Sequence, residues 1–450
     1  MTDTFPLPLR AGVHGCVAAT VEPFGDRLAV VCRVDGARRR GALTADDGET
    51  LAVAAGTALA NRLALVIFLT SSGSDVHDGI DALHGWGHAA RALVRASGIV
   101  PLLMAVHGPV VAGPALLLGL VDAVVMTTDA YAFVSGPHMV QQFTGVPMDN
   151  DELGGSGAHA RHTGVAVAVV PTMDDATDFL TDLVSFLPAH TDEQAPRNPT
   201  DDPPDRLTPE AGDRLPATPT GSYDVRDVIS DVVDDGEHLE LRARWAGNIV
   251  TTLASIGGHS VGIVANQPTA IAGTLDIPSS QKGARFVAFC DAFNLPLITF
   301  VDTPGFYPGK DLEWRGMIRH GAQLAFAYAR ATVPRISVTL RKSYGGAYIV
   351  MDSKRMGNDL SLAWPSAEIA VMGAKGAAEI LHRRASAAEK LEHERIYEER
   401  LLNPYVAAER GYVDAVIDPA DTRRKLTAAL DALESKRERL VERPHDNTPL

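Results

Sequence analysis

The chain has 450 residues, a hydrophobic content of 46% and a formal net charge of −15, which suits two or three domains, each with its own core. The acidic charge disfavours nucleic acid as a partner, because phosphate binding needs a basic surface. No apolar run is long enough to cross a membrane, and no secretory signal opens the chain. Its three cysteines form no closely spaced pair, which favours a reducing, cytoplasmic compartment and no metal site.

The first half alternates apolar runs with helical segments, as α/β folds do. Two short strands are expected within 13–34. They are followed by a helix at 49–61, a strand at 63–69, helices at 80–96 and 112–120, strands at 102–106 and 130–134, and a helix at 176–187. The glycine-dense stretch 152–159 is predicted to be a loop. Residues 71–75 follow the strand 63–69, at the end where α/β folds place ligands.

Seven prolines between Ala189 and Thr220 interrupt this rhythm and predict a linker. We therefore divide the chain into a first domain at 1–190, a linker at 191–221 and a second domain at 222–450. The second domain is expected to hold a helix at 223–229, a hairpin at 249–264, an amphipathic helix around Phe286, strands at 297–301 and 335–340, and charged helices at 385–402 and 423–440.

The stretch 335–351 carries the clearest sign of chemistry. A β-branched run predicts a buried strand, and Gly345 and Gly346 then allow a sharp turn close to a ligand. Ala347 begins a helix, whose first N–H groups lack helical partners. A strand, a glycine turn and these N–H groups would suit an oxyanion. For this segment alone, a turn whose glycines serve packing is an equal alternative.

The pattern occurs twice. Pro101 to Gly113 spans 12 residues, and so does Pro334 to Gly346. Each is followed by a second apolar run and another glycine site. This self-similarity predicts two copies of one α/β domain, each offering an oxyanion site. Such a pair suits a reaction between two carbonyl-bearing substrates.

Several longer motifs resemble the carboxyltransferase (beta) subunit of biotin-dependent acyl-CoA carboxylases, with propionyl-CoA carboxylase-like members the most similar. The motifs lie at 279–294, 296–306, 318–322, 344–348, 363–377 and 403–404. The resemblance is strong from 222 to 423 and moderate from 63 to 187. It is weak before residue 63, where the chain looks shorter than typical relatives.

The resemblance implies two tandem crotonase/ClpP-like β-β-α superhelical domains, in a hexameric ring. It implies transfer of CO2 from carboxybiotin to the α-carbon of an acyl-CoA, with the biotin anion removing the α-proton. Backbone N–H groups would stabilise the enolate and the biotin anion. No Met-Lys-Met attachment motif occurs, so biotin must arrive on a partner chain, the biotin carboxylase or carboxyl carrier subunit. Coenzyme A would enter as part of the substrate.

By family position, the N–H groups of Gly346 and Ala347 would hold the biotin carbonyl, and those of Gly73 and Ser74 the thioester carbonyl. The substrate-binding residues expected around these turns are Gly108, Gly113, Gly136, Pro137, Gly305, Phe306, Tyr348, Ile349, Gly373 and Ala374.

The chain departs from the family pattern at three places. Residues 71–75 read Ser-Ser-Gly-Ser-Asp where relatives usually carry Ser-Gly-Gly-Ala-Arg, so Ser72 must adopt a backbone conformation open to non-glycine residues. Asp75 places negative charge near the expected thioester. Residues 112–114 read Ala-Gly-Pro where Gly-Gly-Ala is usual. Ile349 stands where propionyl-type relatives often have Asp, which predicts a changed acyl-chain preference.

The altered loop at 71–75 leaves two alternatives open. One is a decarboxylase of a malonyl- or methylmalonyl-type thioester on the same fold. The other is a non-catalytic subunit in a mixed ring with an active paralogue. Other polar residues near the glycine turns have structural explanations: hydrogen-bonded roles are expected for His107 and His159, and roles in orienting the backbone for Asp302 and Glu368.

Overall fold

The computed structural model describes residues 6–10, 14–218, 221–441 and 447–449. It divides into two compact units. Unit 1 comprises Met1–Pro196 with Arg242–Trp245, and unit 2 comprises Arg197–Leu241 with Ala246–Leu450. Before the first of the predicted strands, Leu7–Pro8 forms strand β1.

Unit 1 is built on an eight-stranded sheet in the order β1-β2-β3-β4-β5-β6-β8, with β7 paired to β5. The hairpin β2–β3 is antiparallel, and the strands from β3 onward pair in parallel. The strands are β2 (Val17–Phe24), β3 (Arg27–Val34), β4 (Ala64–Ser71), β5 (Leu102–Val111), β6 (Ala123–Thr127), β7 (Tyr131–Phe133) and β8 (Ala168–Val170).

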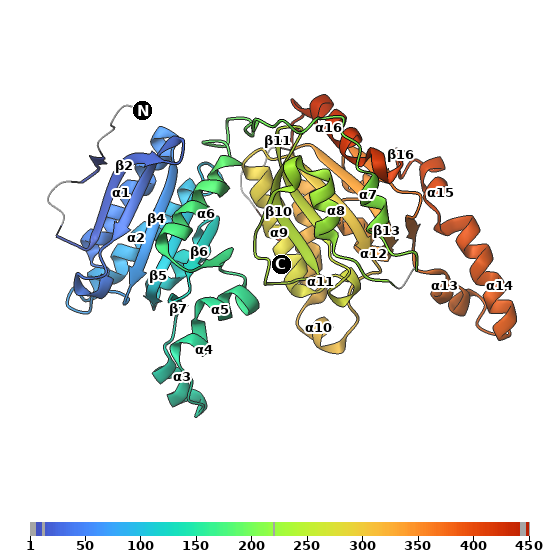
Figure 1. Cartoon of the computed structure of the whole chain (residues 1–450). Helices are drawn as coiled ribbons and strands as arrows, with labels where there is room; N and C mark the ends of the chain where they lie inside the picture. The colour runs from blue at the N-terminus through green and yellow to red at the C-terminus, as the bar shows by residue number, and fades with distance from the viewer. Residues whose placement is uncertain (1–5, 11–13, 219–220, 442–446, 450) are drawn as a thin grey trace. The chain divides into compact units, whose positions relative to one another are not determined.

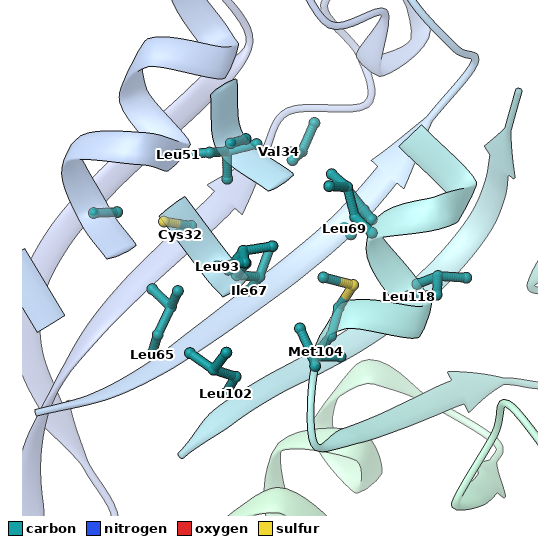
Figure 2. Packing of buried hydrophobic residues seen from close by; sticks show 14 of the residues in the cluster. Cys32, Val34, Leu51, Leu65, Ile67, Leu69, Leu93, Leu102, Met104 and Leu118 are labelled. Atoms are coloured by element: carbon teal, nitrogen blue, oxygen red, sulfur yellow. The ribbon is translucent and has the colours of Figure 1, made fainter. Parts of the chain in front are cut away.

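Helices α1 (Ala45–Asn61) and α2 (Ile80–Ala96) lie against this sheet (Figure 1). Alternate residues of the central strands point to one face, as the strand period requires. Figure 2 shows the resulting core, in which side chains of β4 and β5 pack with Leu51 of α1 and Leu93 of α2. The sheet and its two helices thus form one hydrophobic core.

Unit 2 repeats this topology. Its sheet has the order β16-β14-β13-β12-β11-β10-β9, with β15 paired to β13. The strands are β9 (His238–Glu240), β10 (Ile249–Ile256), β11 (His259–Asn266), β12 (Leu297–Thr303), β13 (Arg335–Tyr344), β14 (Leu360–Ala363), β15 (Glu368–Ala370) and β16 (Ala415–Val416). Strand β10 therefore corresponds to β2, β12 to β4 and β13 to β5. The predicted repeat is confirmed at the level of strand order.

The helices of unit 2 repeat as well. Helix α9 (Ile277–Ala292) follows β11 as α1 follows β3, and both begin with a capping box, at Asp276 and at Thr44. Such caps satisfy the first N–H groups of a helix. Helix α11 (Met317–Arg330) corresponds to α2. The remaining helices of unit 2 that have at least eight residues are α8 (Val225–Val232), α13 (Ala374–Leu381), α14 (Ala387–Tyr397) and α16 (Thr422–Leu433).

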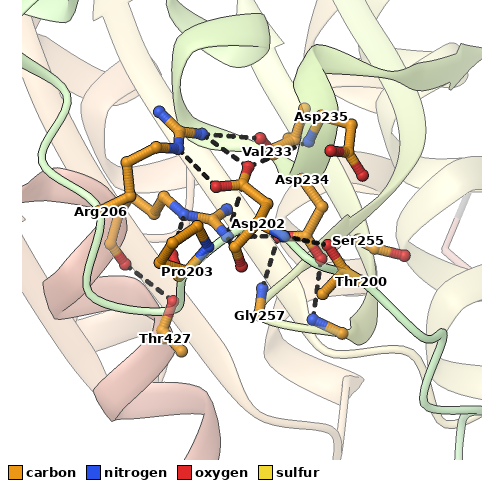
Figure 3. Close-up of polar contacts among 12 residues, drawn as sticks. Thr200, Asp202, Pro203, Arg206, Val233, Asp234, Asp235, Ser255, Gly257 and Thr427 are labelled. Carbon is orange, nitrogen blue, oxygen red and sulfur yellow. Dashed lines mark hydrogen bonds and ion pairs between the residues drawn. The ribbon is translucent and has the colours of Figure 1, made fainter.

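The proline-rich segment is held firmly where it joins unit 2. Arg206 donates to Asp202 at 2.6 Å, and Asp234 accepts the N–H of Gly257 at 2.8 Å (Figure 3). The buried Arg423 lies 2.6 Å from Asp234. Arg206 also donates to the Asp231 carbonyl oxygen at 3.1 Å, and Arg423 lies 3.6 Å from Asp202. The part of the segment from Arg197 onward therefore belongs to unit 2, and it includes a short helix, α7 (Pro209–Asp213).

Two expectations about secondary structure were wrong, at 152–159 and at the end of the last helix, and the helix expected at 112–120 is present but is not an α-helix. Residues 152–159 are not a loop: they lie in α4 (Asn150–Gly154), α5 (Ser156–Ala158) and the start of a π-helix (His159–Thr163). A Cβ on Gly154 would lie 2.1 Å from the Ala132 carbonyl oxygen, so this glycine serves close packing. Residues 113–120 form a 3₁₀-helix, and α16 ends at Leu433, short of residue 440.

Candidate functional site

The turn between β13 and α12 (Gly345–Val350) presents free backbone N–H groups. Gly345 has φ 61°, a conformation that glycine adopts without strain. Within the described residues, the N–H groups of Gly346 and Ala347 have no hydrogen-bond partner. They lie in the first turn of the helix, where an N–H group has no helical carbonyl oxygen one turn before it. These are the two N–H groups that the sequence singled out, and their role as oxyanion donors stays a prediction.

Open space lies in front of this turn. A cavity of about 500 Å³ is lined by the turn, by β15 and by the segment 397–412. A second cavity, of about 470 Å³, is lined by Phe306 and the start of α11. Gly346 and Ile349 border both cavities. Gly346 therefore borders open space on two sides, whereas Ala347 is buried and lines neither cavity.

The first cavity is mostly apolar. The expected residues Tyr348 and Ile349 line it, together with residues that the sequence did not single out: Ile369, Val371, Tyr397, Leu401, Val406, Arg410 and Tyr412. Burial raises the pKa of Tyr348 to about 12, so its hydroxyl stays neutral at physiological pH. The hydroxyl of Tyr344 bonds to Glu368. Glu368 thereby orients a side-chain ring beside the turn, whereas the sequence predicted that it would orient backbone.

Asp302 ties the ends of the two central strands of unit 2 together. Its Oδ2 accepts from the Tyr223 hydroxyl at 2.9 Å and from Arg341 Nε at 3.1 Å. Its Oδ1 accepts the Lys342 N–H at 3.1 Å. Burial raises the pKa of Asp302, and the Arg341 charge opposes that rise. The carboxylate therefore orients backbone, as expected, by joining β12 to β13 just before the turn.

The loop at 71–75 in unit 1, which was predicted to hold the thioester carbonyl, corresponds to the loop that follows β12 in unit 2. Gly73 (φ 112°) and Gly305 (φ 142°) both follow the central strand. The Gly73 N–H donates to Ser71 Oγ at 3.2 Å, and the Gly305 N–H to Thr303 Oγ1 at 3.4 Å. The prediction that Gly73 holds a thioester carbonyl therefore meets an obstacle, since its N–H is already engaged.

Two concerns about this loop are answered by the structure. Ser72 has an ordinary backbone, outside the left-handed region, so the loss of a glycine there costs no strain. Asp75 is buried and pairs with Arg39 at 2.7 Å. The His77 N–H, and then Arg39, hold the pKa of Asp75 below its usual range. The negative charge that was expected to oppose a thioester is thus compensated within the loop.

The closer counterpart of the 345–347 turn is 112–114. Ala112 has φ 59°, near the 61° of Gly345, although the left-handed region is unfavourable for a residue with a Cβ. Its N–H donates to the Phe133 carbonyl oxygen at 3.0 Å. Within the described residues the Gly113 N–H has no partner, and Pro114 has no N–H to offer. Gly108 (φ 58°) lies earlier on β5.

Other predicted residues begin helices beside these turns. Gly136 and Pro137 begin α3 (Pro137–Thr144) after β7, and Gly373 and Ala374 begin α13 after β15. None of these four lines either cavity described above. His159 hydrogen-bonds to Thr163 and to the Ala132 carbonyl oxygen, which confirms its structural role. The described residues contain no cluster that could hold a metal, and none of their helices could span a membrane.

Each unit is built on a mainly parallel sheet with the same strand order, and each has a turn with at least one backbone N–H group that lacks a partner among the described residues. This is the fold of crotonase-like carboxyltransferases. Residues 23–448 match the family model described as the carboxyl transferase domain. The chain belongs to this family.

Named relatives support this assignment. The chain is 42% identical over 396 residues to the propionyl-CoA carboxylase beta chain of Roseobacter denitrificans, covering 87% of this chain and 78% of that one. It is 42% identical over 381 residues to the methylmalonyl-CoA decarboxylase subunit alpha of Veillonella parvula, covering 84% and 74%. The hexameric transcarboxylase 12S structure, with methylmalonyl-coenzyme A and methylmalonic acid bound, superimposes with a TM-score of 0.94 at 41% identity, covering 96% and 85%.

Proposed function

We propose that this chain transfers a carboxyl group from carboxybiotin, carried on a separate protein, to the α-carbon of a short acyl-CoA. The observation that carries the proposal is the pair of unpartnered N–H groups at Gly346 and Ala347 beside a cavity of about 500 Å³. The class of substrate comes from relatives that act on propionyl-CoA or methylmalonyl-CoA.

The turn in unit 2 fits the ureido ring of biotin. The cavity is apolar along its walls, as a small bicyclic ring requires. Gly346 lines it, and the N–H groups of Gly346 and of its neighbour Ala347 are proposed to bind the carbonyl oxygen. Biotin supplies the carried CO2 and, once that CO2 is released, a base for the substrate α-proton. Gly346 and Ala347 donate hydrogen bonds that strengthen as negative charge develops on the oxygen, which lowers the barrier.

Asp302 and Gly345 keep these donors in place. Asp302 joins β12 and β13 at the carboxyl ends of the strands, and Gly345, with φ 61°, turns the chain just before the two N–H groups. Preorganised donors need no rearrangement when charge develops, which is why backbone groups can replace side-chain acids and bases here. Ile349 borders both cavities and is proposed to set acyl-chain preference.

The test uses the full chain with a biotinylated carboxylase partner, ATP, bicarbonate and acetyl-, propionyl- and butyryl-CoA. A carboxylated product, dependent on the partner, is expected. Absence of product with all three thioesters would refute the proposal. We further propose a homohexamer in the cytoplasm, in keeping with three buried, free cysteines; a mass near six times 47.8 kDa in light scattering is expected.

A decarboxylase is the second candidate, because one relative is the methylmalonyl-CoA decarboxylase subunit alpha. Release of CO2 from methylmalonyl-CoA in the absence of both ATP and any biotinylated partner would favour it. If CO2 is released only when biotin is added, the carboxyl group is passing to biotin and the first proposal holds.

A further inference from the structure

The turn in unit 1 lacks one donor that its counterpart has. Pro101 and Pro334 lie the same 12 residues before Gly113 and Gly346, so Pro114 corresponds to Ala347. A proline nitrogen carries no hydrogen. Unit 1 therefore keeps only the Gly113 N–H where unit 2 has two N–H groups. A carbonyl held at this turn needs a second donor from elsewhere.

Each turn is covered by an aromatic ring, but the ring comes from a different element. In unit 2, a Cβ on Gly346 would lie 3.6 Å from the ring of Phe306, which belongs to the loop after β12. In unit 1, a Cβ on Gly113 would lie 2.6 Å from Trp86 Nε1, which belongs to α2. The rings have exchanged places between loop and helix, and only the ring in unit 1 carries an N–H.

The residue at the helix position is large in unit 1 and small in unit 2, and the residue at the loop position is small in unit 1 and large in unit 2. Counting back from the Arg-Ala pair at the end of each helix, Trp86 corresponds to Gly321. A Cβ on Gly321 would lie 3.3 Å from the Phe306 ring. Ser74 in unit 1 takes the position of Phe306, since each follows the glycine of its loop. Each also forms an isolated β-bridge with an equivalent residue outside the strands, Ser74 with Leu43 and Phe306 with Leu275.

The Trp86 indole N–H and the Ser74 hydroxyl have no polar counterpart at Gly321 and Phe306 of unit 2, and both are buried. Within the described residues, Trp86 Nε1 and Ser74 Oγ have no hydrogen-bond partner and almost no solvent-exposed surface. Both residues belong to segments that lie against the turn: a Cβ on Gly113 would lie 2.6 Å from Trp86 Nε1, and a Cβ on Gly73, the residue before Ser74, would lie 3.6 Å from Ala112 Cβ. Buried donors without partners are rare in native proteins and call for a specific explanation.

We propose that the Trp86 indole N–H and the Ser74 hydroxyl complete, with the Gly113 N–H, the donor set for the thioester carbonyl of the acyl-CoA. The proposal rests on the proposed function, because the ligand is an acyl thioester. The three donors replace the pair of amides found in unit 2. As the α-proton leaves, the carbonyl oxygen gains negative charge, and hydrogen bonds to it become charge-assisted and stronger.

A binding experiment tests this without turnover. Propionyl-CoA has a carbonyl at the thioester, and S-propyl-CoA, its thioether analogue, has none. The wild-type chain is expected to bind the thioester at least about fivefold more tightly, and Trp86→Phe and Ser74→Ala each to reduce that ratio, since each removes one donor. Trp314→Phe is the matched control, because Trp314 is 77% exposed on α10 (Lys310–Trp314); it should leave the ratio unchanged.

Rescue separates a donor from a packing residue. Pro114→Ala restores the missing N–H, so the double variant Trp86→Phe/Pro114→Ala should recover most of the thioester preference. The same double variant should recover kcat, which Trp86→Phe alone is expected to lower about 10- to 100-fold with little change in KM. Thermal melting of each variant reports any loss of folding.

The outcomes distinguish this inference from the proposed function. Loss of preference in Trp86→Phe and its recovery in the double variant support the donor set, even if no carboxyl transfer is detected. An unchanged preference in both single variants overturns it, even if the enzyme is an active carboxyltransferase. A wild-type chain with no preference for the thioester, or no binding of either compound, also overturns it.

Discussion

The two turns show how one backbone design can be supplied with different donors. In unit 2 a glycine at φ 61° precedes two free N–H groups, and a buried carboxylate joins the strands beneath. In unit 1 an alanine holds φ 59°, a proline removes one N–H, and Thr70 stands where Asp302 stands in unit 2. Among the residues that the structure describes, Thr70 Oγ1 makes one hydrogen bond, at 3.4 Å to the Pro109 carbonyl oxygen.

The comparison teaches that the geometry of a turn and its donors can diverge independently. The strand order, the loop glycines and the positive φ are all retained in both units. The residues that supply hydrogen bonds and charge are not. Variants that exchange these residues between units, or remove them, therefore measure what each difference contributes.

The largest expected effect on stability is at Asp302. Asp302→Asn keeps the shape but leaves the buried Arg341 without its counter-charge, which should cost about 3–5 kcal/mol of unfolding free energy. Thr70→Val, the matched change in unit 1, removes one weak hydrogen bond and should cost about 1 kcal/mol or less. Urea denaturation of both variants measures the difference. Equal costs would show that the carboxylate does not join the strands as described.

The next effect is a dependence of stability on pH. Asp352 is fully buried beside Arg335, and burial raises its pKa to about 7. Between about pH 4 and pH 7 the folded state holds a proton that the unfolded state has released. The contribution of Asp352 to stability is therefore greatest below pH 4 and falls as pH rises to 7, by about 4 kcal/mol at most. Asp352→Asn should flatten this slope in urea titrations at pH 5 and pH 7.5; an unchanged slope would place its origin elsewhere.

A smaller effect is expected at the turn glycine of unit 2. A Cβ on Gly345 would lie 3.2 Å from the Val371 carbonyl oxygen, and its φ is 61°. Gly345→Ala should therefore cost about 1–3 kcal/mol and reduce carboxyl transfer, since the following N–H groups move. Thermal unfolding gives the first quantity and a transfer assay the second. A fully stable, fully active variant would mean that the turn tolerates a Cβ.

The smallest effect is the reverse change in unit 1. Ala112→Gly removes a Cβ from a left-handed residue and should raise stability by about 1 kcal/mol, part of which is lost to the freer unfolded chain. Calorimetric melting, with Ala115→Gly as a control at a residue of the following 3₁₀-helix, checks the sign. A lower melting temperature for Ala112→Gly would contradict strain at this turn.

Much of the fold could be predicted from the sequence, because hydrophobic period and spacing determine strands and amphipathic helices. Helix 80–96 matches α2 at both ends. The hairpin 249–264 matches β10 and β11. The 152–159 helices were missed, since glycines usually indicate loops, whereas here Gly154 permits close approach to a neighbouring strand.

The candidate site could be predicted only in part. The 345–347 turn was readable because strand, glycines and helix are consecutive in sequence. The cavity wall was not, because Arg410 and Tyr412 come from a distant segment with no local motif. In unit 1 the engagement of the Gly73 N–H by Ser71 and the approach of Trp86 to Gly113 depend on three-dimensional packing.

The most direct test of the account is the removal of one N–H from the turn in unit 2. Ala347→Pro imposes on that turn the proline of unit 1, and Ala347→Ser keeps the N–H at nearly the same size. Transfer of a carboxyl group from methylmalonyl-CoA to free biotin is the measured reaction. The account predicts that Ala347→Pro loses about 100-fold or more in kcat, as loss of one oxyanion donor does, while Ala347→Ser stays within a few-fold of wild type. Equal activity of two folded variants would contradict it.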